Sequence, residues 1–236
     1  MINKSLNIKA FTLVELLVVV TIIGLLAGLG VPAISGALKK AKSGACLSNL
    51  RQIGIATLAY AADNSFSFPD AGSGNTPAWA TNLAAFMSTD TKSKKGIFVC
   101  PGAEKPVQEA GSGEVAVTYG MHGGLMPKGA PSTNRLSSIS RASEVILCAD
   151  MCQNPGNKGW SPYSIENPPV FTSQAGGRGA GAAMDSAIST ATDSDTGNSA
   201  WMRYRHNGKV NVVMCDGHAE SIKKGSVLNK NAIFTQ

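Results

Sequence analysis

A stretch without any charged side chain runs from Leu16 to Leu38 and limits what this chain can fold into. A helix needs about 20 apolar residues, each rising about 1.5 Å, to cross the hydrocarbon of a bilayer. The stretch meets that length. An apolar surface of this size is unfavourable in water, so lipid, the rest of the chain or other proteins must cover it. We therefore expect residues 11–34 to form a helix that sits in a membrane or packs among other helices.

The residues before this stretch indicate its orientation. Residues 1–10 carry Lys4 and Lys9 and no acid, so the positive-inside rule keeps the N-terminus in the cytoplasm and exports the rest. The lysines at 39–42 reduce this charge asymmetry. The segment can be a cleaved secretory signal, a plain single-pass anchor or an assembly helix. A secretory signal has an apolar core of roughly 7–15 residues, which is shorter than this run.

An acidic side chain stands at the start of the apolar stretch. Glu15 is followed directly by Leu16 and Leu17. A carboxylate costs about 2–3 kcal/mol or more at the centre of a membrane helix and less near its edge. Either Glu15 lies at the level of the lipid headgroups, or a positive group is delivered to it during assembly.

Residues 10–19 read AFTLVELLVV and closely resemble the N-terminus of type IV prepilins and type II secretion pseudopilins. The resemblance implies that residues 1–10 are a basic leader cut between Ala10 and Phe11, where the family usually has Gly before the cut. It also implies that the new amine of Phe11 is methylated, and that Glu15 pairs with the amine of a neighbouring subunit.

The resemblance implies assembly rather than catalysis. The chain would be a structural subunit of a type IV pilus-like or type II secretion pseudopilus fibre, with a single span in the inner membrane and its globular part outside the cytoplasm. Its partners would be copies of itself or other pilins, prepilin peptidase and the inner-membrane assembly platform. Pro32 falls where family members carry a helix-bending proline. Pilus, pseudopilus and DNA uptake all stay open, as does a singly anchored envelope protein that binds a ligand or metal ion without polymerising.

The helical pattern continues beyond the apolar stretch, over residues 35–62. An apolar stripe recurs there every three or four residues, as on one face of an amphipathic helix: Cys46, Leu50, Ile53, Thr57 and Tyr60. We expect one helix of about 50 residues that ends near Asp63, with Pro32 bending it. The stripe must pack against a globular part.

Residues 63–236 predict a loop-rich antiparallel β region. We expect a helix over 79–87 and strands over 114–119, 144–149, 201–206, 210–215 and 218–222. Asn207-Gly208 and Asp216-Gly217 are strong hairpin signals and would join the last three strands into a meander. Residues 173–199 are small and polar and predict a mobile loop. The expected fold class is α+β, a long N-terminal helix packed on a small antiparallel sheet, and by resemblance pilin-like.

His206, Asp216 and Gly217 show the spacing H-x9-D-G, which resembles a C-terminal signature found with pilin-like N-termini. With a tight turn at each end of the intervening strand, the His and the Asp would lie roughly 20 Å apart at about 3.3 Å per residue. Metal ligands lie within about 2–2.6 Å of their ion. We therefore expect structural roles, with Asp216 making its turn and His206 capping or packing the preceding one.

Catalytic, cofactor and metal motifs are weak. A zinc site from His122, His206 and His218 stays open on residue type alone. Residues 193–198 resemble the start of a calcium loop, but the Gly comes one place early and no Glu follows at the required distance. No nucleophile elbow or phosphate-binding loop is present. We expect no enzyme activity, no cofactor and no metal, and the scattered charge of +6 predicts no nucleic-acid partner.

The chain has five cysteines, an odd number. Disulfides are permitted if the body lies outside the cytoplasm. Our expected disulfide is Cys46–Cys100, which would staple the helix stripe to the loop-rich region. Cys148–Cys152 is a second candidate if a turn intervenes. Cys148 and Cys215 lie in apolar strands and are also candidates for buried free thiols.

Overall fold

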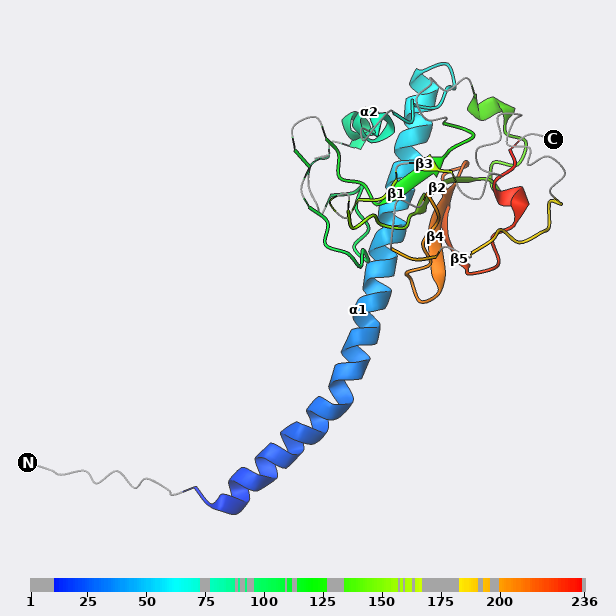
Figure 1. Cartoon of the computed structure of the whole chain (residues 1–236). Helices are drawn as coiled ribbons and strands as arrows, with labels where there is room; N and C mark the ends of the chain where they lie inside the picture. Colours follow the sequence, from blue (N-terminus) through cyan, green and yellow to red (C-terminus); the bar gives the residue numbers. More distant parts are fainter. Residues whose placement is uncertain are drawn as a thin grey trace, which may run out of the picture. The chain divides into compact units, whose positions relative to one another are not determined.

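The computed structural model divides the chain into two compact units, 1–40 and 41–236, which are described separately. It describes residues 11–72, 77–87, 89, 92, 96–108, 110–111, 114–126, 134–156, 158, 160–162, 164–166, 183–190, 193–195 and 200–234, with only the backbone at 30, 32 and 33. Helix α1 (Leu13–Asp63) begins in the first unit and ends in the second (Figure 1). The prediction of one helix of about 50 residues is confirmed.

Local chemistry accounts for the two ends of α1. Thr12 and Glu15 form reciprocal hydrogen bonds at its start. At its end Ser65 and Phe66 adopt positive φ angles of 54° and 60°, and the Phe66 N–H donates to the Ala61 carbonyl at 2.7 Å. Left-handed residues of this kind terminate helices and satisfy their last carbonyl groups. The helix continues through Pro32, and the bend expected there stays a prediction.

The second unit contains a five-stranded sheet with the order β3-β1-β2-β4-β5. Its strands are β1 (Tyr119–His122), β2 (Ile146–Asp150), β3 (Ser164–Ile165), β4 (Lys209–Met214) and β5 (Ala219–Lys223). Neighbouring strands pair antiparallel except β1 and β3, which are parallel. The α+β class is confirmed, and the sheet is mixed rather than wholly antiparallel because the unpredicted strand β3 pairs parallel to β1.

Short helices complete the second unit. The predicted helix at 79–87 is confirmed as α2 (Ala78–Met87), which buries Trp79 against Phe98 with ring centroids 5.5 Å apart. Among the described residues, the 3₁₀ turn η1 (Leu136–Ser138) precedes β2, and the 3₁₀ turn η3 (Asn229–Asn231) follows β5. The loop predicted to be mobile, 173–199, is described only at 183–190 and 193–195, where Ile188 is buried.

Two strand predictions are wrong in position. The strand expected at 114–119 is β1, which covers 119–122 instead. Just before it, the backbone of Thr118 bonds to Phe98 and Met151 outside the sheet. Residues 201–206 do not form the first strand of a meander. Their backbone bonds beside the end of β2, where the Arg203 N–H donates to the Asp150 carbonyl at 2.9 Å. The Asn207-Gly208 turn is therefore closed by the backbone hydrogen bonds between His206 and Lys209 and does not join two paired strands.

The sheet has an apolar cluster on each face. One contains most of the α1 stripe, together with Trp79, Leu147 and Val213. The other contains Val210, Val212 and Met214 with Ile233 from the C-terminal segment. Alternate residues of a strand point to opposite faces, so β4 contributes to both clusters. This is why every residue of β4 after Lys209 is buried.

The α1 stripe lies very close to β4. A Cβ atom on Gly54 would stand 2.6 Å from Cγ2 of Val213 and 3.4 Å from the Cα of Gly217. Gly217, at φ +89°, is in the turn after β4. The absent side chain at Gly54 lets the helix approach the β4–β5 hairpin.

His122, at the end of β1, is fully buried. Its Nε2 bonds the Ala232 carbonyl at 2.7 Å, and its Nδ1 accepts from the N–H groups of Gly124 and Leu125. This pattern is that of a neutral imidazole. Burial lowers the pKa of His122 to about 4, although its hydrogen bonds to the backbone oppose the shift.

Gly54→Ala should destabilise the second unit. The added methyl group forces Val213 or the hairpin to move, which costs about 1–3 kcal/mol and exceeds the roughly 1 kcal/mol that Ala gains over Gly in a helix. Gly44→Ala is the matched control, because a Cβ there has nothing within 4 Å. Denaturant unfolding of the detergent-solubilised chain, followed by tryptophan fluorescence, measures both. Equal effects of the two variants would contradict the close approach.

Stability should fall as the pH drops from about 6.5 to 4, because the unfolded chain then binds a proton that neutral His122 in the folded chain excludes. A pKa of about 4 in the folded state corresponds to a loss of roughly 3 kcal/mol over this window. His122→Asn keeps an acceptor for the backbone N–H groups and cannot titrate. The free energy of unfolding of the variant should therefore vary less with pH than that of the wild type. Parallel pH curves would show that His122 does not titrate as proposed.

Candidate functional site

The start of α1 is a hydrogen-bonded cap. The Glu15 carboxylate accepts from the Thr12 N–H at 2.9 Å and the Thr12 hydroxyl at 2.8 Å, and the Thr12 hydroxyl accepts from the Glu15 N–H. This is a capping box, which satisfies N–H groups left free at a helix start. Phe11 is 71% exposed just before it, and Ala10 lies outside the described residues.

The first half of α1 has an apolar surface that its own unit leaves uncovered. The large apolar side chains from Phe11 to Leu38 are between 46% and 79% exposed. This is the one helix among the described residues that is long and apolar enough to span a membrane. A Cβ on Gly24 or Gly28 would meet nothing within 4 Å, so this small-xxx-small pair is open to a neighbouring helix.

The side chain of His206 lies in a buried cluster, where its partners are Asp150 and Cys100. Asn207 and Gly208 adopt φ angles of 55° and 73°, as a type I′ turn requires, and place His206 next to the end of β2. Its Nε2 lies 3.1 Å from Oδ2 of Asp150 and 3.4 Å from Sγ of Cys100.

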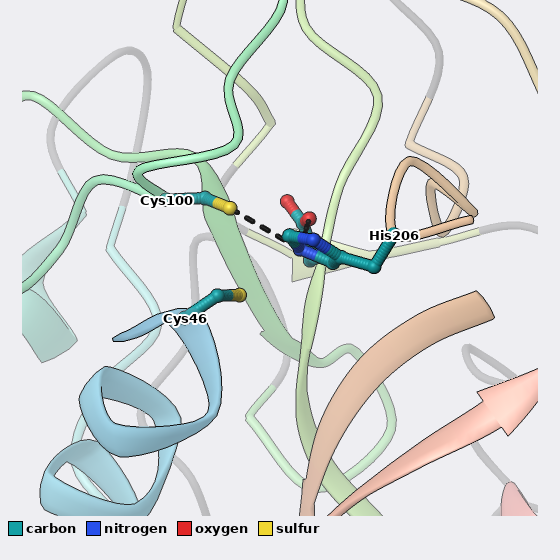
Figure 2. Close-up of side chains that lie close together, drawn as sticks. Cys46, Cys100 and His206 are labelled. Carbon is teal, nitrogen blue, oxygen red and sulfur yellow. Dashed lines mark hydrogen bonds and ion pairs between the residues drawn. The ribbon is translucent and has the colours of Figure 1, made fainter. Parts of the chain in front are cut away.

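Four side chains meet at this point and are called here the buried tetrad: Cys46, Cys100, Asp150 and His206. One potential ligand atom from each lies within 4.8 Å of all the others. Figure 2 shows the Cys46 sulfur on α1 facing the Cys100 sulfur and the His206 ring. All four residues belong to the second unit, and they come from a helix, a loop, a strand end and a turn.

An irregularity in β2 aims Asp150 at the tetrad. Ile146 belongs to the far cluster, but Leu147 and Cys148 both belong to the cluster around the α1 stripe. The pairing with β4 shifts register between Ile146 and Cys148, as at a β-bulge. Beyond the shift, Cys148 and Asp150 share the face that looks toward α1.

Arg205 encloses the carboxylate of the tetrad. Its side chain is fully buried, and its Nε donates to Oδ2 of Asp150 at 2.9 Å. Its other nitrogens bond Gln153 at 2.9 Å, the Met151 carbonyl and, at 3.5 Å, Asp195. The guanidinium therefore compensates a carboxylate that is itself completely buried.

The sulfurs have polar neighbours that set their charge. Burial opposes ionisation of Cys46, but hydrogen bonds with Cys100 and His206 outweigh it and lower the pKa of Cys46 to about 6. Burial lowers the pKa of His206, but the bond to Asp150 outweighs that effect and raises it to about 9. Burial and the neighbouring Cys46 raise the pKa of Cys100 well above its usual value. One thiolate beside one imidazolium is the charge state these contacts favour.

The structure brings Cys46 and Cys100 together, as the expected disulfide requires, but both are free cysteines without a disulfide bond. Cys148, Cys152 and Cys215 are also buried free thiols. The prediction of a Cys46–Cys100 bond is thus not met in this state, because each sulfur bonds instead to polar groups of the tetrad and its surroundings.

The other candidate sites do not assemble. His122 bonds the backbone, and His218 bonds the carboxylate of Asp216 at 2.6 Å, so the three histidines have separate partners. Asp216 also accepts from the His218 N–H and makes the turn after β4, as predicted.

The described part of the suggested calcium loop consists of ion pairs. Asp193 binds Arg203 and Lys224, both at 2.7 Å, and Asp195 binds Arg203 at 3.2 Å. These cations neutralise the carboxylates that a calcium ion would need.

Asp150 and Arg205 were missed by the sequence analysis. Asp150 directly follows an apolar strand, and Arg205 directly precedes His206. An acid at a strand end beside a buried core is a signal for an ionic partner. The bulge that turns Asp150 toward Cys46 leaves no such signal.

Residues 6–31 match the family model described as Prokaryotic N-terminal methylation motif. The chain therefore carries the prepilin-type N-terminal signature. The match covers the region that contains Ala10, Phe11 and Glu15 and most of the exposed apolar surface. No curated protein and no solved structure matches the chain.

Arg205→Leu should destabilise the second unit by about 3–5 kcal/mol, because Asp150 would be left as an uncompensated buried charge. Adding Asp150→Asn should recover part of the loss, since no buried charge then remains at that position. Arg51→Leu, at an exposed position of α1, should stay within about 0.5 kcal/mol of the wild type. The free energies of unfolding, measured in denaturant, form a double-mutant cycle. Additive effects of Arg205→Leu and Asp150→Asn would disprove their coupling.

Proposed function

We propose that this chain is a structural subunit of a type IV pilus-like or type II secretion pseudopilus fibre, assembled through its N-terminal helix. The proposal rests on two features that occupy the same part of the chain. The prepilin-type signature at 6–31 falls on a helix whose apolar side chains are uncovered from Phe11 to Leu38. A long helix followed by a mixed sheet is consistent with a pilin-like fold.

The exposed apolar surface supports two successive environments. Lipid covers it while the subunit waits in the inner membrane as a single-pass protein, with its globular part on the far side. Helices of other subunits cover it in the fibre, where the open Gly24 and Gly28 permit close approach. Transfer between the two is feasible because no charge is present between Leu16 and Leu38.

Processing would give Glu15 a new partner. Prepilin peptidase would remove residues 1–10 and leave a methylated amine on Phe11. In the uncleaved chain the Glu15 carboxylate caps Thr12. In the fibre it would pair with the amine of a neighbouring subunit, because a carboxylate among apolar helices needs a positive partner. That pairing would set the register of one subunit against the next.

Two variants at one position separate the charge of Glu15 from its capping bond. Glu15→Gln keeps an acceptor for Thr12 and removes the charge, whereas Glu15→Ala removes both. Both variants should enter the membrane and fall about tenfold or more in fibre incorporation, as loss of a buried ion pair predicts. Sheared fibre and membrane fractions are quantified by immunoblot. Thr12→Ala, which weakens the cap and keeps the charge, should assemble like the wild type.

Mass spectrometry of the wild-type N-terminus is the control, because methyl-Phe11 shows that processing occurred. Normal incorporation of Glu15→Gln would refute the pairing. Crosslinking in membranes tests the alternative of a singly anchored protein. Ladders through the N-terminal helix support the fibre, and monomers alone, with Met1 retained, would overturn it.

A further inference from the structure

The buried tetrad lies outside the N-terminal region that matches the methylation motif, and it is built from groups that bind metals. Cys46, Cys100 and Asp150 are at most 1% exposed, and His206 is 7% exposed. Thiolate, imidazole and carboxylate are all ligand types that zinc binds in proteins. Thiolate ligands disfavour calcium and magnesium, which prefer oxygen.

The spacing of the tetrad fits tetrahedral coordination. Zinc bonds of about 2.0–2.3 Å place the ligand atoms of a tetrahedron roughly 3.3–3.8 Å apart. Nε2 of His206 lies 3.1 Å from Oδ2 of Asp150 and 3.4 Å from Sγ of Cys100. No pair of the four atoms exceeds 4.8 Å. Small side-chain movements therefore suffice to reach coordination distances.

An unpartnered oxygen points independently to a ligand. Oδ1 of Asp150 is buried and has no hydrogen-bond partner among the described residues, whereas Oδ2 binds Arg205 and His206. Leaving a buried carboxylate oxygen without a partner is costly. A cation bound by Asp150 would satisfy this carboxylate, and His206 would then turn its neutral nitrogen to the metal rather than donate to Oδ2.

The surrounding groups suit a divalent cation. Two thiolates and Asp150 carry three negative charges, and Arg205 beside them carries one positive charge. A doubly charged ion brings this buried set to neutrality. The Tyr119 hydroxyl donates to Sγ of Cys46 at 3.4 Å, and the Gly102 N–H donates to Sγ of Cys100 at 3.3 Å. Outer donors of this kind hold metal ligands in place.

We infer that the buried tetrad binds one zinc ion, with Cys46, Cys100, Asp150 and His206 as its four ligands. Four protein ligands leave no open position, so the site is structural rather than catalytic. The ion ties α1 to the loop at Cys100, to the end of β2 and to the turn before β4. Gly102 permits the arrangement, since a Cβ there would lie 2.7 Å from Cε1 of His206.

The first test uses the full chain in detergent, purified from the cell envelope without chelator. Elemental analysis should find about one zinc per chain after dialysis. Replacement by Co²⁺ should give the strong sulfur-to-cobalt absorption and the visible bands of a tetrahedral thiolate site. Absence of both signals would overturn the inference. So would a Cys46–Cys100 disulfide found by peptide mapping of protein alkylated before reduction.

The second test asks which cysteines hold the metal. Cys46→Ser and Cys100→Ser should each weaken zinc binding at least tenfold in a chelator competition. Cys152→Ser is the matched control, because Cys152 is equally buried but its thiol donates to the Met202 carbonyl outside the tetrad. Equal zinc content in all three variants means adventitious binding and refutes the site.

Alkylation of the wild-type chain covers the case in which a tetrad variant does not fold. Chelator should increase the labelling of Cys46 and Cys100 more than that of Cys152, and unchanged labelling would count against the site. Each of these readouts is independent of fibre formation.

Discussion

The packing of α1 against the β4–β5 hairpin is the contact on which the second unit depends. The stripe that begins at Cys46 covers one face of the sheet, and Gly54 brings the helix backbone against Val213 and Gly217. Apolar burial of this kind is the main favourable contribution to folding. The same contact fixes where Cys46 lies, so the helix supplies a core face and one side chain of the buried tetrad together.

The first half of α1 differs, because its apolar side chains are exposed, whereas a soluble protein buries most side chains of this kind. Isolated apolar side chains are common on surfaces, but a continuous apolar helix surface marks an interface. The family match identifies this surface as part of a prepilin-type N-terminus, which its composition alone does not. One helix thus has two parts, one with apolar side chains exposed all round and one with a single apolar stripe packed against its own sheet.

Periodicity and turn chemistry predicted α1, α2, β2 and the β4–β5 hairpin, because their signals are local. The prediction failed where partners are distant in sequence. Residues 201–206 have the alternation of a strand but bond beside β2, since Arg205 and His206 must reach Asp150. Cys46 and Cys100 were singled out as a pair, yet Asp150 was not. Its orientation depends on a register shift between β2 and β4 that composition does not reveal.

The edge strand of the sheet affects whether molecules of this chain associate through their sheets at high concentration. β5 lies at an edge of the sheet, and Glu220 and Lys223 are exposed along it. Unpaired strand edges recruit other strands, and charged side chains discourage this. Molecules concentrated side by side can therefore keep their sheets separate, so contacts between them are left to other surfaces and runaway β-aggregation is resisted.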